Sequence, residues 1–378
     1  MLRRTLLRAG AAATGAIQSS AASGSIPLGY DTYSIRDFRW KASQLIDYAA
    51  KMKLDTLQIS GLDEYESIEP GHLQRVKDHA DRLGVAIDAG IGCICPTSSA
   101  WNPRNGTPQE YIARGLRVAK AVGASSMRCF VGSGAERRGP LPIEKHVEST
   151  LGVLRSVRSQ AQDTGVKIAI ENHNGDLRAR ELRALVEEAG KDFVGVCLDS
   201  GNPIWLLEDP QFTLETLGPY VTTTHIRDTA LYEHPRGAAF QWVALGDGSI
   251  DLAAWIAGVR ALAPKVALQL EIITGRPPQV LPYLERDFWR IFPEFPAADF
   301  ARFLALVKKG RPYTGPMMIA PPGKQPPEYA AALKHQQMVD LERSLEYAKK
   351  ALGAGDAWRR RDDAATRRRS DTAPLLGR

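Results

Sequence analysis

Four side chains that can bind a divalent metal ion stand at the ends of four successive apolar stretches. The stretches are KIAIE, VGVCLD, VTTTH and VALQLE, and they end on Glu171, Asp199, His225 and Glu271. Three carboxylates and one imidazole suit a hard or borderline ion such as Mn²⁺, Mg²⁺ or Co²⁺; Zn²⁺ is also compatible, although no thiolate favours it. We therefore predict one divalent metal site, made by these four residues.

A structural role is the alternative for any one of these residues. A carboxylate at the end of a buried strand can simply accept hydrogen bonds from neighbouring backbone amides. That explanation becomes weaker when the pattern recurs on four consecutive strands, because parallel strands in α/β folds bring their carboxyl ends to one face, where the chemistry of such folds takes place.

This ligand set indicates chemistry next to a carbonyl group. An ion bound by a carbonyl oxygen and an adjacent hydroxyl makes the neighbouring carbon-bound proton acidic, because it stabilises the enediolate. Glu171 and Glu271 are the predicted catalytic pair, one removing the proton and the other returning it, which gives a sugar isomerase or epimerase. Expulsion of a substituent would instead give a lyase or dehydratase on a keto-sugar or 3-keto-glycoside. A non-catalytic sugar-binding barrel is the third interpretation.

Two further polar residues lie near the predicted ligands. His173 is two residues beyond Glu171, and Arg227 is two residues beyond His225. Alternate residues of a strand point to the same side, so we predict that both side chains contact a polyhydroxylated substrate. The alternatives are a structural histidine for His173 and an ion pair from Arg227 to a barrel carboxylate, for example Asp228. Aromatic residues that could support a sugar ring, or belong to the core, are Tyr33, Trp205 and Trp242.

Eight short apolar stretches alternate with amphipathic ones, which predicts an α/β fold. The expected strands are 28–34, 56–60, 85–91, 126–131, 167–171, 194–199, 221–226 and 266–272. The expected helices between them are 42–52, 72–83, 107–122, 143–162, 179–189 and 252–262. Continuous apolar runs indicate parallel strands buried on both faces, and eight such strands close a (β/α)8 TIM barrel.

The motifs IENHNGD, VCLDSGNP, THIRD, GDGSID and LQLEI, in this order, resemble the sugar isomerase and epimerase superfamily with the xylose isomerase-like barrel, especially its ketose 3-epimerase branch. The resemblance covers roughly residues 26–274. It implies that the four matched residues bind one divalent ion, commonly manganese, and that Glu171 and Glu271 act as acid and base. Asn202 stands where that family has a substrate-binding histidine, and we predict that it contacts the substrate.

Composition and charge restrict the partners. The chain has 378 residues and a net charge of +6, but its basic excess is concentrated at the two ends. The central part therefore has no basic stripe of the kind that binds nucleic acid, and we predict a small carbohydrate as the partner. Four cysteines are too few for a disulfide scaffold.

The two ends of the chain differ from its middle. Residues 1–25 contain Arg3 and Arg4 before a weakly apolar run, which resembles a twin-arginine signal for export to the periplasm. This run is too short to span a membrane. Residues 275–352 are predicted to form a Pro-rich insertion, which serves as a lid, a homo-oligomer contact or ordinary packing, followed by a C-terminal helical extension. Residues 353–378 are predicted to be a disordered Arg-rich tail.

Overall fold

Eight parallel strands form a closed barrel in the computed structural model, which describes residues 25–319, 323 and 325–360. Strands β2 to β7 pair in sequence order, and β1 pairs with β10. The bridges Asp31–Gln58 and Ile226–Leu270 join these two groups into a ring. The predicted (β/α)8 barrel is therefore confirmed. Its strands are β1 Leu28–Tyr30, β2 Thr56–Ile59, β3 Ala86–Cys93, β4 Ser126–Phe130, β5 Lys167–Glu171, β6 Val194–Asp199, β7 Val221–His225 and β10 Leu268–Leu270.

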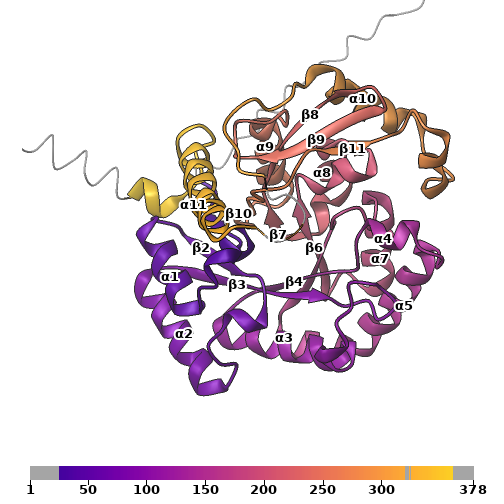
Figure 1. Cartoon of the computed structure of the whole chain (residues 1–378). Helices are drawn as coiled ribbons and strands as arrows, with labels where there is room; N and C mark the ends of the chain where they lie inside the picture. The colour runs from indigo at the N-terminus through magenta and orange to yellow at the C-terminus, as the bar shows by residue number, and fades with distance from the viewer. Residues whose placement is uncertain (1–24, 320–322, 324, 361–378) are drawn as a thin grey trace, which may run out of the picture.

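Helices surround the barrel and bury their apolar faces against it (Figure 1). Several of them end at a glycine in the left-handed conformation; Gly84 after α2 and Gly123 after α3 have φ angles of 69° and 81°. The helix expected over residues 143–162 is divided at Val157. The helices of this layer are α1 Ala42–Lys51, α2 Pro70–Leu83, α3 Pro108–Val122, α4 Gly134–Arg138, α5 Ile143–Ser156, α6 Arg158–Thr164, α7 Ala179–Ala189, α8 Pro210–Leu217 and α9 Leu252–Leu262. Short 3-10 helices are η1 Thr32–Phe38, η2 Leu62–Glu64, η3 Pro103–Asn105, η4 Asn202–Leu206, η5 Gly218–Tyr220 and η6 Arg286–Ile291.

A second, antiparallel layer covers one side of the barrel mouth (Figure 1). It consists of β8 Asp228–His234, β9 Gly237–Val243 and β11 Gln279–Leu281, with α10 Ala297–Lys309 against β8. Its aromatic residues form a hydrophobic core of their own, which includes Phe240, Phe292 and Phe303. The Pro-rich segment is thus packed into this layer. The sequence analysis did not predict the β8–β9 hairpin, because its residues lack a clear alternation of apolar and polar side chains.

The C-terminal extension returns to the barrel. Helix α11 Pro327–Lys350 packs against η1 and β10. The disordered tail predicted from residue 353 is wrong for residues 353–360. Ala354 is fully buried, and Gly355 N–H donates to the carbonyl of Ile26. The remainder of that tail, and the predicted signal up to residue 24, lie outside the described residues. Across the part of the chain that is described, no helix is both long and apolar enough to cross a membrane.

Asp55 connects this C-terminal segment to the first strand. Its carboxylate accepts hydrogen bonds from the amides of Leu28, Asp356 and Ala357 at 3.0, 2.8 and 2.6 Å. We expect Asp55→Ala to lower the free energy of unfolding by about 2–4 kcal/mol, because three amides lose a charged acceptor. Denaturant unfolding measures this loss. Asp78→Ala, which removes an exposed carboxylate that accepts a hydrogen bond from Gln74, is the control; equal losses in both variants would contradict the expectation.

Candidate metal centre and substrate cavity

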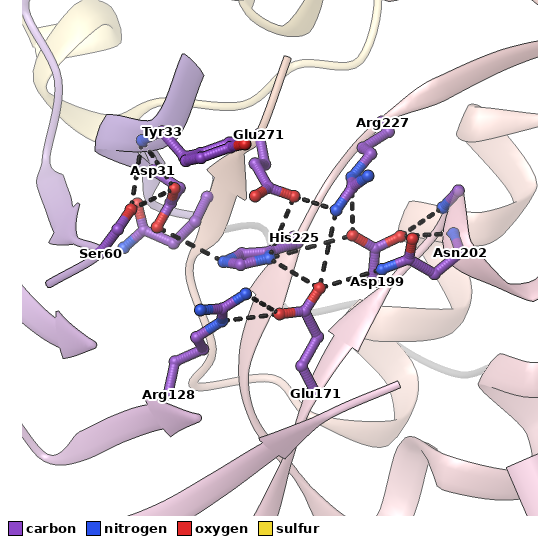
Figure 2. Close-up of polar contacts among 12 residues, drawn as sticks. Asp31, Tyr33, Ser60, Arg128, Glu171, Asp199, Asn202, His225, Arg227 and Glu271 are labelled. Carbon is purple, nitrogen blue, oxygen red and sulfur yellow. Dashed lines mark hydrogen bonds and ion pairs between the residues drawn. The ribbon is translucent and has the colours of Figure 1, made fainter. Parts of the chain in front are cut away.

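The four predicted ligands meet at the carboxyl ends of their strands (Figure 2). Glu171, Asp199 and His225 are the last residues of β5, β6 and β7, and Glu271 directly follows β10. Each contributes one ligand atom, and these atoms all lie within 4.8 Å of one another. All four residues are buried. The fold therefore assembles the predicted set at one point inside the barrel mouth.

Backbone amides fix the orientation of Asp199. Its Oδ1 accepts hydrogen bonds from the amides of Gly201 and Asn202, both at 2.7 Å. The other oxygen, Oδ2, faces the centre. It lies 2.8 Å from Arg227 Nε, but no donor among the described residues meets it in hydrogen-bond geometry. One oxygen is thus held by the fold, and the other remains available for a cation.

His225 directs its Nδ1 atom at the same centre. Its Nε2 contacts Gln58 Oε1 and lies 3.5 Å from Asp31 Oδ2, so Nε2 carries the proton. The Gln58 amide is itself oriented, because its Nε2 donates to Thr223 at 2.9 Å. His225 Nδ1 has no hydrogen-bond partner among the described residues, and it lies 3.4 Å from carboxylate oxygens of both Glu171 and Glu271. A ring nitrogen surrounded by carboxylate oxygens in this way marks a position that a cation can occupy.

The pKa values of the three carboxylates also indicate a site for a cation. Burial opposes ionisation of Glu171, but Arg128 and His225 outweigh it and hold its pKa well below the usual range. Burial likewise opposes ionisation of Glu271, yet Arg227 and His225 lower its pKa to about 2. Burial raises the pKa of Asp199 to about 7 against the pull of Arg227. The site thus concentrates buried carboxylates around His225 Nδ1, and three oxygen donors with one imidazole nitrogen fit a divalent ion that takes the place of the imidazole proton.

Three residues of the site were missed by the sequence analysis. Arg128 on β4 donates from Nε to Glu171 Oε2 at 2.6 Å, and Gln58 and Asp31 contact His225. Each is a polar residue within or just after a short apolar strand, which is the signal that could have identified them. The spacing of residues in the sequence does not show which residues on other strands these three side chains contact.

A cavity of about 440 Å³ opens directly above the centre. Of the four ligand residues, only Glu271 lines it. The residues predicted to contact substrate all lie on its wall, and so do the two tryptophans; this set comprises His173, Asn202, Arg227, Trp205 and Trp242. Its volume is in the range of small-molecule sites.

Each of the predicted substrate-binding residues also contacts the protein. His173 stacks on Phe130 at 4.1 Å, and its Nδ1 lies 2.5 Å from the carbonyl of Gly132. Asn202 donates from Nδ2 to Glu171 Oε1 at 3.0 Å. Arg227 forms ion pairs with Asp199 and Glu271, so the alternative of an ion pair to a barrel carboxylate is confirmed, with these two partners in place of Asp228. These contacts position the side chains at the cavity.

Several polar atoms at the cavity have no partner among the described residues. They are the indole N–H groups of Trp205 and Trp242 and the amide oxygen of Asn202. A buried polar group without a partner is costly, so these atoms are candidates to bind a ligand. The Arg227 guanidinium lies 4.9 Å above the Trp242 ring. The wall therefore offers apolar surface together with hydrogen-bonding groups, a combination suited to a sugar.

Gln58 provides a test of the His225 orientation. We expect Gln58→Leu to weaken Mn²⁺ binding by about 10- to 100-fold, because an outer partner that fixes the tautomer of a ligand histidine is lost. Isothermal titration calorimetry measures the affinity. The control is Gln74→Ala on the outer surface of α2, which should bind Mn²⁺ like the unmodified protein. Unchanged affinity in Gln58→Leu would contradict this role.

Comparison with known proteins agrees with this geometry. The family model described as "Xylose isomerase-like TIM barrel" matches residues 46–290. This chain belongs to the xylose isomerase-like TIM-barrel family. That assignment confirms the resemblance seen in the ordered motifs and the barrel fold.

Members and structural neighbours of the xylose isomerase-like barrels show the range of the fold. The 3-oxo-isoapionate decarboxylase of Pectobacterium atrosepticum is 23% identical over 236 residues, which are 59% of this chain and 77% of that protein. A D-psicose 3-epimerase structure, solved in the presence of D-fructose, aligns with a TM-score of 0.55 at 16% identity over 87% of this chain and 100% of that one. The IolI protein with a bound zinc atom aligns at 0.51 and 15% identity, over 74% and 96%.

Proposed function

We propose that this protein is a metal-dependent carbohydrate isomerase or epimerase that forms an enediolate next to a sugar carbonyl. One observation carries the proposal: the Glu271 carboxylate, held by Arg227 and beside His225, forms part of the wall of a sugar-sized cavity. A carboxylate in that place can reach a carbon-bound proton of a ligand in the cavity.

Glu171, Asp199, His225 and Glu271 are the residues that would hold the ion, with Mn²⁺ favoured and Mg²⁺, Co²⁺ or Zn²⁺ as alternatives. When bound, a divalent ion supplies Lewis-acid stabilisation of negative charge on the substrate oxygens. The unpartnered Nδ1 of His225 and Oδ2 of Asp199 support this ligand role. The IolI neighbour, which contains zinc, has the same fold.

The remaining steps belong to side chains of this chain. Glu271 takes the proton from carbon and, in an isomerisation, returns it to the adjacent carbon; an epimerisation also needs Glu171 to deliver a proton to the opposite face of the same carbon. Asn202 keeps Glu171 in place through its 3.0 Å hydrogen bond, and Arg128 keeps Glu171 ionised. The indole N–H groups of Trp205 and Trp242 would bind substrate oxygens, while their rings exclude water. The 3-epimerase among the structural neighbours supports a stereochemical outcome of this kind.

A lyase is the second candidate, and one contact favours it. Both oxygens of Glu171 are engaged, Oε1 by Asn202 and Oε2 by Arg128, and Glu171 does not line the cavity. Epimerisation needs two groups that exchange protons on opposite faces, whereas loss of a carboxylate as carbon dioxide needs a single proton, which replaces it on carbon and can be relayed from solvent by Glu271. Arg128 and Arg227 at the same cavity could hold the carboxylate of a keto-acid. The decarboxylase relative supports this candidate.

Isotope exchange distinguishes these possibilities. Mn²⁺-loaded protein is incubated in deuterated water with ketoses, 3-keto-sugars, 3-keto-glycosides and 3-oxo sugar acids. Deuterium in an isomeric sugar supports the isomerase or epimerase. Release of carbon dioxide or of an aglycone supports the lyase. Binding of these sugars without exchange or release would contradict both and indicate a sugar-binding barrel.

The paired Arg3 and Arg4 support export to the periplasm by a twin-arginine route. A fusion of residues 1–25 to a reporter that requires export tests this. Arg3→Lys/Arg4→Lys should retain the reporter in the cytoplasm, and continued export of that variant would contradict the assignment.

A further inference from the structure

A second cavity of about 570 Å³ adjoins the first one. The two cavities share three wall residues, Tyr33, Ser60 and Arg128. Figure 2 shows these residues beside His225 and Glu271, so the shared wall is part of the candidate centre. Each cavity alone has the volume of a small-molecule site. The two together therefore have more volume than a single sugar ring occupies.

Basic side chains line the second cavity. Arg36, Arg39 and Lys41 follow one another along and just after η1. Arg36 donates only to carbonyl oxygens, those of Tyr33 at 3.1 Å and Thr274 at 3.3 Å. Lys41 contacts the carbonyl of Asp63. Within the described ranges, none of these three cations forms an ion pair with a carboxylate.

The acids of this cavity do not balance these charges. Only Asp63 and Glu64 among its wall residues are acidic. Burial raises the pKa of Glu64 to about 8, so this side chain is largely neutral at pH 7. Arg128, at the junction, is already paired with Glu171. The second cavity thus keeps an excess of positive charge beside an aromatic wall that includes Trp40 and Tyr111.

We propose that the second cavity binds an anionic group, a phosphate or a carboxylate, on a second unit of the substrate. This inference deepens the proposed function and rests on it: the sugar that reacts occupies the first cavity, and the charged unit extends past Tyr33 to Arg36, Arg39 and Lys41. Cations at the rim of a cavity that are not neutralised by a carboxylate bind anions through charge-assisted hydrogen bonds. Aromatic side chains beside them supply a surface for a second ring.

Binding to the full-length protein tests the second cavity apart from the chemistry. The probes are glucose, glucose 6-phosphate, glucuronate and inorganic phosphate, titrated calorimetrically into chelator-treated and Mn²⁺-loaded protein at low and high salt. We expect both charged sugars to bind at least about tenfold more tightly than glucose, with the advantage reduced at high salt. A preference for glucose 6-phosphate identifies phosphate as the group, and a preference for glucuronate identifies carboxylate.

Matched variants locate this binding. Arg39→Gln/Lys41→Gln should weaken binding of the charged sugars by about tenfold and leave glucose unchanged. Lys191→Gln/Lys265→Gln removes the same charge from exposed loops at the opposite end of the barrel and should change nothing. Equal affinities for charged and neutral sugars, or unchanged binding in the first double variant, would overturn the inference. If this binding behaves as expected but no sugar undergoes isotope exchange or bond cleavage, the proposed function fails and the anion site stands.

Discussion

Replacing Glu271 by glutamine is expected to lower the rate of isotope exchange, or of the lyase reaction, by about 10³-fold or more. Glutamine keeps the shape and one oxygen donor, but it can neither take a proton from carbon nor deliver one to it. Glu271 is the ligand residue that lines the cavity, so its loss cannot be replaced by another carboxylate of the site. Initial rates in deuterated water, followed by mass spectrometry, measure the effect.

Glu171→Gln separates the two candidate reactions. If epimerisation needs both glutamates, this variant should lose as much activity as Glu271→Gln. If Glu171 acts mainly as a ligand held by Arg128, it should retain more activity. The control is Glu144→Gln on the exposed surface of α5, which should behave like the unmodified protein. Full activity in Glu271→Gln would remove this residue from the mechanism.

Removal of the metal is expected to destabilise the protein as well as stop turnover. An ion that binds only the folded state stabilises it by about 3–4 kcal/mol when its concentration is 100 to 1,000 times Kd. Without it, the carboxylates of Glu171, Asp199 and Glu271 repel one another in a buried site. Thermal unfolding with and without a chelator, followed by addition of Mn²⁺, Co²⁺, Mg²⁺ or Zn²⁺, measures this stabilisation and ranks the ions.

Asp199→Asn is the matched control for the metal experiment. It retains the hydrogen bonds that its oxygen accepts from Gly201 and Asn202, but it loses the charged Oδ2 that faces the centre. The unfolding temperature of this variant should respond much less to Mn²⁺. An equal response in the variant and the unmodified protein would show that the ion binds elsewhere.

The barrel and the ligand set could be predicted because both leave a local pattern. Buried parallel strands appear as short apolar runs, and a strand that ends in Glu171 or Asp199 places that carboxylate at a known end of the sheet. Successive strands then bring these ends together. The prediction needed only the order of the elements, which a βα repeat provides.

The other parts depend on contacts between distant residues, which spacing does not reveal. Arg128 reaches Glu171 on the adjacent paired strand, whereas Gln58 on β2 reaches His225 on β7 only because the sheet curls into a ring. The β8–β9 hairpin packs against the Pro-rich segment. Because that layer buries side chains on both faces of the hairpin, its sequence does not show the alternation of apolar and polar residues that predicts a strand. Residues 353–360 are ordered by Asp55 and Ile26, far away in sequence, although their composition suggested disorder.

The central claim is that Glu171, Asp199, His225 and Glu271 bind one divalent ion. The most direct measurement is anomalous diffraction from crystals grown with Mn²⁺, recorded on both sides of the manganese absorption edge. The account predicts one strong anomalous peak at roughly 2.0–2.4 Å from an atom of each of the four side chains. A peak at another place, or none between these residues in protein that binds Mn²⁺ in solution, would contradict it.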